Sequence, residues 1–408
     1  MGPAWLWLLG AGIAASAHGD KSPAVAPALS SQLSEPAPAY LKVTPTITSF
    51  ALRLYKRLAA DTAGNLLFSP VSMASTLAML SLGARPDAPA QVLEGLGFNL
   101  TETPEADVHQ GFQSLIRTLQ LPSPKLELKL GNSLFLDQQL KPRQHFLDSA
   151  RELYGAFAFS ANFTDSTSTG RQINDYVRTQ TYGRVQDCLQ DFHHDTLAVL
   201  LNHIFFKGTW AHPFDPQSTE EKSFYVDDTT TVMVPMMFQS STVKYLHDPV
   251  LPCRLVQLDY VGNGTAFFIL PDKGKVDTVI AALSRDTIQR WSKSLTYRLV
   301  HLYIPKASIS GAYELRGALA AMGIADLFTN QANFSSISQE GPLKVSKVLH
   351  KAVLQLDEHG GVEVAATGGP LQLVSEPLTL NFNRPFLILI FDDFTWSSLF
   401  LGKVVIPA

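Results

Sequence analysis

The fold is decided near the C-terminus by the stretch His350–Phe386, HKAVLQLDEHGGVEVAATGGPLQLVSEPLTLNFNRPF. Its two ends, Lys351–Leu356 and Leu378–Phe382, alternate apolar and polar residues and are predicted to be strands. The connection between them, Asp357–Pro377, has about twenty residues, a length that is uncommon in compact domains unless the loop is functional. Its Gly, Ala, Val and Thr residues suit a segment that can itself become a strand. We therefore predict a long loop that is able to join a sheet.

This stretch resembles the serpin family. Leu380–Ile390, LNFNRPFLILI, is similar to the C-terminal signature of the family, and His350–Glu358 is similar to the strand that precedes its reactive loop. Further blocks that resemble serpin segments are Asn65–Gly83, Lys207–Phe214, Val234–Met237, His301–Lys306 and Leu399–Val404. The resemblance covers roughly residues 46 to 408. It implies a single α+β domain with about nine helices, three β-sheets and an exposed reactive-centre loop at about 357–377.

Periodicity gives part of this fold independently. A helix is predicted from Thr46, with Ile47, Phe50, Leu54 and Leu58 on one face. Val71–Leu82 is apolar nearly all round, which predicts a buried helix with Gly83 as its C-cap. Leu126–Leu136 and Thr196–Phe206 have the patterns of strands, and the second reads as a buried central strand. Helical segments early and strands late favour an α+β fold over alternating βα units.

The N-terminus predicts export from the cell. Residues 1–19 contain the apolar run Ala4–Ala14 followed by Ala15-Ser-Ala17, the form of a signal peptide with its cleavage site. Residues 20–45 are rich in Ala, Pro and Ser and are predicted to be a disordered extension. Asn-x-Ser/Thr triplets predict N-glycosylation at Asn99, Asn162, Asn263 and Asn333. We expect a secreted, extracellular glycoprotein of blood plasma with no membrane span and a monomeric state.

Composition and charge exclude some classes of binding partner. The 408 residues carry a formal net charge of −4 and show no basic stripe, which argues against a nucleic-acid partner. The two cysteines, Cys188 and Cys253, allow either two free thiols or one bridge. The family resemblance favours free thiols.

No catalytic motif is visible, so the chain is predicted not to be an enzyme and to need no metal or cofactor. The one cluster of histidines, His193-His194-Asp195, consists of adjacent residues that do not share a helix face and cannot easily chelate one metal. We interpret these residues as a solvated loop before the strand at Thr196.

Two functions consistent with the family remain open, and the first is inhibition of a serine protease. The family resemblance implies that such an inhibitor inserts its cleaved loop into a sheet by way of a hinge of small residues. Here the predicted hinge residues are Gly360, Gly361, Glu363, Ala365 and Thr367. Glu363 would point inward, and burial of an unpaired carboxylate costs several kcal/mol. Pro370 would deny the inserted strand a hydrogen-bond donor. Both features argue against fast insertion.

The second function is that of a non-inhibitory hormone carrier. Segments that resemble the hormone carriers of the family are Tyr245–Asp248, Leu255–Thr265, Ile280–Thr287, Ile324–Ser335 and Phe394–Phe400. This resemblance implies a transport protein for glucocorticoids and progestins such as cortisol, with a pocket between the first helix, a helix around Val276–Trp291 and nearby strands. A steroid needs an aromatic face, apolar walls and a few directed polar groups.

The steroid-binding residues that the resemblance implies are Gln257, Arg285, Gln289, Phe391 and Trp396. Trp396 would stack on the rings and Phe391 would form a wall, whereas Gln257 would reach a keto or hydroxyl group. Arg285 and Gln289 are i,i+4 neighbours on one helix face. Taken without the resemblance, ordinary core packing or a solvated helix face explains each residue, and Trp291 is expected in the core.

In the carriers, cleavage of the exposed loop by a protease such as elastase is implied to release the steroid. The candidate cleavage region here is Val364, Gly369, Pro370 and Val374. Proline directly after the scissile position resists cleavage, so we expect the cut at Gly369-Pro370 to be weakened or shifted to Val364 or Val374.

Overall fold

The computed structural model describes residues 36–84, 89–123, 125–183, 192, 196–329, 334–338, 345–359 and 376–407. The compact unit begins at Pro38, earlier than the predicted residue 46. Tyr40 lies in a 3-10 helix, Ala39–Lys42, and is buried, as is Val43. The end of the predicted extension therefore belongs to the folded unit, whereas the predicted signal peptide lies outside the described residues.

Nine α-helices lie in the described part of the chain: α1 (Thr44–Asp61), α2 (Pro70–Ser81), α3 (Pro89–Leu96), α4 (Glu105–Leu119), α5 (Gln144–Tyr154), α6 (Ser166–Gln180), α7 (Val276–Ala282), α8 (Arg285–Ser294) and α9 (Arg316–Ala321). The strands are β1 (Leu66–Phe68), β2 (Leu126–Asp137), β3 (Phe157–Ala161), β4 (Ala198–Gly208), β5 (Glu220–Tyr225), β6 (Thr231–His247), β7 (Cys253–Asp259), β8 (Gly264–Pro271), β9 (Thr296–Pro305), β10 (Ala307–Glu314), β11 (Lys347–Leu356), β12 (Leu378–Asn381), β13 (Phe386–Asp392) and β14 (Ser398–Val404).

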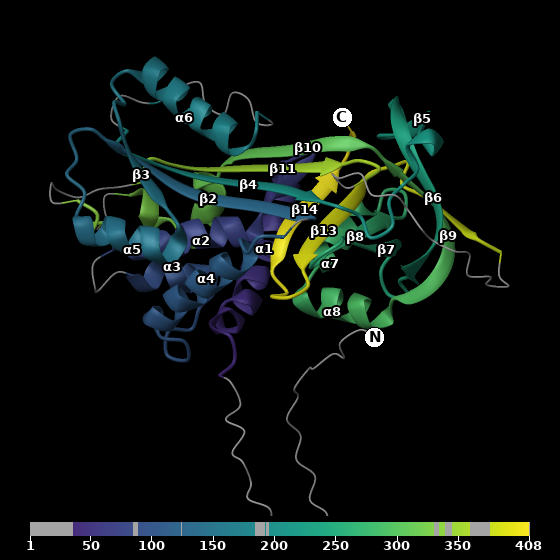
Figure 1. The fold of residues 1–408 in the computed structure, drawn as a ribbon, viewed down its shortest axis with the longest axis horizontal. Helices are drawn as coiled ribbons and strands as arrows, with labels where there is room; N and C mark the ends of the chain where they lie inside the picture. Colours follow the sequence, from purple (N-terminus) through teal and green to yellow (C-terminus); the bar gives the residue numbers. More distant parts are fainter. Residues whose placement is uncertain are drawn as a thin grey trace, which may run out of the picture. The chain divides into compact units, whose positions relative to one another are not determined.

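One sheet has five strands in the order β10-β11-β4-β2-β3. Its central strands β4 and β11 are parallel, while β2 and β10 are antiparallel to their inner neighbours. Figure 1 shows α6 on one face of this sheet and α2 and α5 on the other. The predicted strand Thr196–Phe206 is confirmed as β4, and it is buried along most of its length because both faces of the sheet are covered.

The other sheet has nine strands, in the order β1-β14-β13-β8-β7-β6-β9-β12 with β5 beside β6. The long strand β6 pairs with β5 over Thr231–Met236 and with β7 over Lys244–His247. By hydrogen bonding the described strands form two sheets, and β6, which pairs with β5, β7 and β9, joins two parts of the larger one. Strand β11 ends in the five-stranded sheet and β12 begins in the nine-stranded sheet, so the long predicted loop connects the two sheets.

A buried polar cluster holds β4 to β11 beneath α2. Asn202 of β4 is the register partner of His350 of β11, and its Oδ1 lies 2.6 Å from His350 Nδ1. Asn202 also accepts from Ser72 Oγ of α2 at 2.5 Å and donates to Asn132 Oδ1 of β2 at 2.8 Å. His350 Nε2 accepts the backbone N–H of Ser69 at 2.9 Å. Burial lowers the pKa of His350 to about 3, so the ring is neutral.

Two local predictions need correction. The helix predicted over Val276–Trp291 is split into α7 and α8 because Ser284 is extended and caps α8 by accepting from Thr287 N at 3.1 Å. Gly83 follows α2, as predicted, but it is not left-handed. A glycine is required here for another reason, because a Cβ at this position would collide with Ile337.

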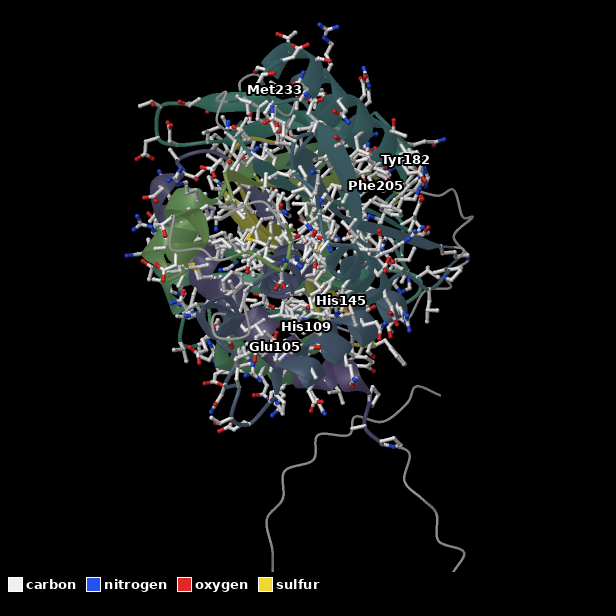
Figure 2. The ribbon with its side chains drawn as sticks, turned by 90° about the vertical axis from the view of Figure 1, so that its left-hand side faces the viewer. Glu105, His109, His145, Tyr182, Phe205 and Met233 are labelled. Atoms are coloured by element: carbon white, nitrogen blue, oxygen red, sulfur yellow. The ribbon has the colours of Figure 1, made fainter. Side chains whose placement is uncertain are left out.

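Helices α4 and α5 pack side by side through a buried histidine. His109 Nδ1 of α4 lies 2.5 Å from Tyr154 Oη of α5, and His109 Nε2 lies 3.3 Å from Glu105. Figure 2 shows Glu105 and His109 together with His145 of α5 in one region of the molecule. The contact fixes α5 against the rest of the helical layer.

Cys253 is a free, buried thiol, and loss of hydration raises its pKa to about 12. Cys188 and the cluster His193-His194-Asp195 lie outside the described residues. Among the described helices, none is both long and apolar enough to cross a bilayer.

Candidate functional site

Strands β7, β8 and β13 place two predicted site residues and one neighbour on the same face of the nine-stranded sheet. Gln257 of β7 is opposite Phe267 of β8, and Phe391 of β13 is opposite Thr265 of β8. Because side chains alternate along a strand, Gln257, Phe267 and Phe391 share a face. The rings of Phe267 and Phe391 lie 5.8 Å apart. They form an apolar wall next to the Gln257 amide.

Trp396 lies in the turn between β13 and β14, with its ring centroid 6.5 Å from that of Phe391. Asp392 shapes the turn: its Oδ2 accepts from Thr395 N at 2.7 Å and its backbone carbonyl accepts from Trp396 N at 2.7 Å. Trp396 has a left-handed backbone, with φ of +56°, which is unfavourable for a bulky residue. The turn therefore holds a half-buried tryptophan in a strained conformation, a frequent property of binding sites.

The Gln257 amide is oriented by a neighbour that the sequence analysis missed. Gln257 Nε2 donates to Asp259 Oδ1 at 2.8 Å, and Thr265 Oγ1 donates to the same oxygen at 3.0 Å. A carboxylate only accepts, so the Gln257 carbonyl oxygen is left as an acceptor for another group. Asp259 lies two residues after Gln257 on the same strand face, and this spacing is the sequence signal that could have identified it.

A hollow of about 100 Å³ adjoins Gln257 and Asp259. Its other walls include Trp210, His212, Lys244 and Tyr297. Ligand sites usually measure about 300–1,000 Å³, so this hollow has room for one end of a steroid only.

Three carboxylates gather beside the turn. The Asp393 side chain is exposed as a whole, yet lost hydration and the charges of Asp259 and Asp392 raise the pKa of its carboxyl to about 6, against the opposing charge of Lys244. Burial also raises the pKa of Asp392, although Thr395 donates to it. The turn is therefore sensitive to pH in the mildly acidic range.

The remaining two predicted residues lie on α8. Arg285 is exposed in the first turn, and Gln289 is half-buried one turn later on the same face. Neither lines the hollow beside Gln257. Helix α8 is fixed by Asp248, which accepts two hydrogen bonds from Arg290 at 2.8 and 2.7 Å and one from Trp291 Nε1 at 2.6 Å. Trp291 is fully buried, as expected.

The start of the long loop is anchored to the segment Trp210–Phe214. Trp210 donates from Nε1 to the Asp357 carbonyl and from its backbone N–H to the His359 carbonyl, both at 3.0 Å. The buried Glu358 accepts from Lys306 at 2.9 Å and from Thr219 at 2.9 Å. Although burial alone would raise the pKa of Glu358, these donors keep it below its ordinary value.

The same segment touches the hollow. Trp210 stacks on Tyr260 with ring centroids 4.1 Å apart, and Ala211 N donates to the Asp259 carbonyl at 2.8 Å. Trp210 and His212 line the hollow beside Gln257. One short segment therefore contacts both the loop and the candidate site.

The described chain places some predicted modification sites and leaves others untested. Asn99 and Asn263 are exposed, and Asn162 is half-buried. The residues that lie outside the described part of the chain are Asn333, the hinge residues Gly360, Gly361, Glu363, Ala365 and Thr367, and the candidate cleavage residues Val364, Gly369, Pro370 and Val374. In the described part, no group of three or more His, Cys, Asp or Glu side chains could hold a metal ion.

The fold combines a five-stranded sheet whose central pair is parallel, a second sheet that bears this site, and a long connection between the two. This combination defines the class of protein, and the comparison with family models gives the same class. Residues 45–407 match the family model "Serpin (serine protease inhibitor)", so the chain belongs to the serpin family, as the sequence predicted.

Individual relatives show where in the family its similarities lie. Corticosteroid-binding globulin of Oryctolagus cuniculus is 73% identical over 367 residues, which cover 90% of this chain and 96% of the relative. Serpin A11 of Rattus norvegicus is 53% identical over 424 residues, covering 100% of both chains. The crystal structure of human thyroxine-binding globulin with its hormone superposes with a TM-score of 0.85 at 41% identity, covering 91% of this chain and 100% of that one.

Proposed function

We propose that the chain is a secreted, monomeric plasma carrier that binds cortisol-like glucocorticoids and progestins and has no catalytic activity. The observation that carries this proposal is that Phe391 and Gln257 share one face of the nine-stranded sheet, with Trp396 in the turn beside Phe391. The similarity to corticosteroid-binding globulin and to the thyroxine-binding structure supports it, since both printed names are those of hormone binders.

The chemistry of the constellation suits a steroid. The half-buried Trp396 offers aromatic surface to a flat apolar ring system, and the buried rings of Phe391 and Phe267 support it from behind. The oriented Gln257 amide offers an acceptor for a hydroxyl hydrogen at the end of the rings. In this proposal Arg285 and Gln289 approach the ligand from α8.

We propose further that steroid release is coupled to the loop. A loop that leaves β11 and inserts between β11 and β4 would become an antiparallel neighbour of both strands, since these two run parallel. Insertion requires residues after Leu356 to leave the carbonyl contacts with Trp210 and Phe214. Because Trp210 and His212 also line the hollow beside Gln257, their movement would change the ligand site.

An inhibitor of a serine protease is the alternative function, favoured by the printed description of the family. The parallel seam between β4 and β11, which is hydrogen-bonded in this structure, could accept an inserted strand in either function once the two strands separate. Glu363 and Pro370 in the predicted hinge and loop argue against the fast insertion that trapping requires.

Equilibrium dialysis of cortisol and progesterone against the secreted full-length protein tests the carrier function. We expect saturable one-to-one binding, and weaker binding after elastase has cut the loop. Absence of binding by correctly folded protein, together with a covalent complex with a serine protease on a denaturing gel, would establish the inhibitor instead.

A further inference from the structure

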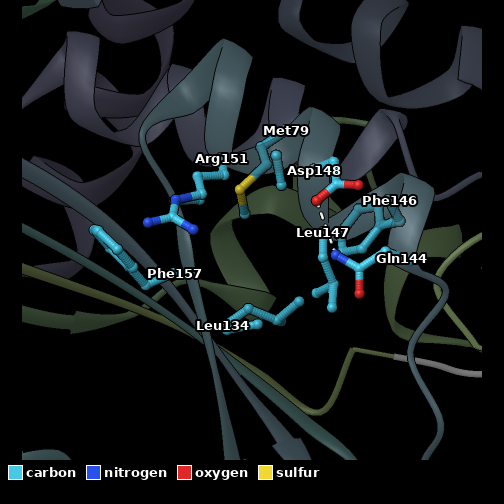
Figure 3. A pocket seen from close by; sticks show the side chains of 11 residues that line it. Met79, Leu134, Gln144, Phe146, Leu147, Asp148, Arg151 and Phe157 are labelled. Carbon is cyan, nitrogen blue, oxygen red and sulfur yellow. Dashed lines mark hydrogen bonds between the residues drawn. The ribbon is translucent and has the colours of Figure 1, made fainter.

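A second hollow is lined by residues of α2, β2, α5 and β3, which are distant in sequence from the residues of the proposed hormone site. Its volume is about 210 Å³. Figure 3 shows Met79 of α2, Leu134 of β2 and Leu147 of α5 around its centre. Met79 and Leu134 are buried, so they form an apolar floor. The predicted functions assign no role to these residues.

The mouth of the hollow has an aromatic wall on each side. Phe146 is buried, whereas Phe157, the first residue of the sheet-edge strand β3, is 50% exposed. Arg151 lies over one face of the exposed Phe157 ring, so only the other face and the edge are left for a bound ring.

The charges at the rim differ between the two ends. The Arg151 guanidinium lies over the Phe157 ring, 5.7 Å from its centroid, and in the described part of the chain it forms no ion pair with a carboxylate. Asp148 lies at the opposite end, where Gln144 Nε2 donates to it at 2.8 Å. Figure 3 shows Arg151 and Asp148 pointing apart with the apolar floor between them.

We propose that this hollow binds a small aromatic carboxylate, with the ring on Met79 and Leu134 and the carboxylate on Arg151. A cavity of about 150 Å³ is large enough for benzene, so 210 Å³ accommodates one ring system with a short acidic arm. Its lining from α2, β2, α5 and β3 shares no residue with the hollow beside Gln257, which separates this site from the hormone site. Repulsion by Asp148 fixes the orientation of the acid, and the arginine fork matches a carboxylate.

Indole-3-acetate is a suitable probe, and indole, which lacks the acid, is its matched control. For a ligand of this size we expect a Kd of about 1 mM or tighter. In full-length protein with methyl-labelled methionines, indole-3-acetate should shift the Met79 signal, assigned through Met79→Leu, through the ring current of the bound indole. Indole should bind about tenfold more weakly, because it makes no charged hydrogen bond.

Three variants locate the site. Arg151→Gln should weaken indole-3-acetate about tenfold and leave indole unchanged, whereas Arg178→Gln on the exposed face of α6 should change neither. Leu147→Trp should fill the hollow from its half-buried rim and abolish both. An unshifted Met79 signal, equal affinity for acid and indole, or full affinity in Arg151→Gln would each overturn the proposal. Circular dichroism of every variant confirms that a loss of binding is not a loss of fold.

Discussion

Two polar regions of this serpin differ in almost every physical respect. The cluster around Asn202 and His350 is buried, neutral and hydrogen-bonded to its neighbours, and it joins the two strands at the centre of the five-stranded sheet. The cluster around Gln257, Asp259 and Asp393 is partly exposed and charged, and it lies next to a strained tryptophan. The comparison teaches that the polar groups of the first region stabilise the fold by bonding to one another. Those of the second region keep hydrogen-bonding positions that a ligand can use.

The largest expected effect comes from breaking the buried cluster. Asn202→Ala removes an acceptor shared by Ser72 and His350, and it leaves their polar groups buried without that partner. We expect a loss of about 3 kcal/mol in the free energy of unfolding. Urea unfolding followed by fluorescence measures it, while steroid affinity of the folded fraction should stay within twofold. A loss below about 1 kcal/mol would show that the cluster is not what holds β4 to β11.

A smaller effect is expected at the oriented amide. Asp259→Asn permits the Gln257 amide to rotate, because an asparagine can donate as well as accept. We expect cortisol affinity to fall about fivefold, equivalent to about 1 kcal/mol, with unfolding little changed. Competition dialysis measures the change, and Asp175→Asn on the exposed face of α6 serves as the control. Unchanged affinity in Asp259→Asn would mean that Gln257 does not contact the steroid.

The smallest effect concerns pH. The raised pKa of Asp393, about 6, means that its contribution to stability is present below the unfolded value near 3.8 and is lost as pH rises through 6. A bound apolar ligand would dehydrate this carboxyl further, so cortisol should bind about twofold to threefold more tightly at pH 5.5 than at pH 7.5. Binding isotherms at both values test this, and Asp393→Asn should flatten the difference. His212 also borders the hollow, so His212→Gln serves as the control. If Asp393 is responsible, the difference in affinity between the two pH values should persist in this variant.

The sequence predicted the architecture better than the details. The strands β4 and β11, the buried helix α2 and the long connection after Leu356 were predicted because periodicity and length are local signals. The break between α7 and α8 was missed since it depends on one capping serine within an otherwise continuous helical pattern. The early start at Pro38 was missed because the burial of Tyr40 comes from tertiary packing.

In the candidate site, too, some residues were predicted from the sequence and others were missed. Its predicted aromatic and amide residues came from the family resemblance, and Gln257, Phe391 and Trp396 do lie on connected strands and turns. Asp259 and Asp393 were not predicted, because their roles depend on hydrogen bonds and charges between strands far apart in the chain. Strand alternation alone could have suggested Asp259.

The most direct test of the carrier function is a cortisol titration of the wild type beside Trp396→Ala and Trp291→Phe. Loss of the aromatic face at Trp396 should weaken cortisol about thirtyfold, or about 2 kcal/mol, with the unfolding curve nearly unchanged. Trp291→Phe, which removes a buried donor to Asp248, should instead lower stability and leave the affinity of the folded protein intact. Wild-type affinity in Trp396→Ala would contradict the account.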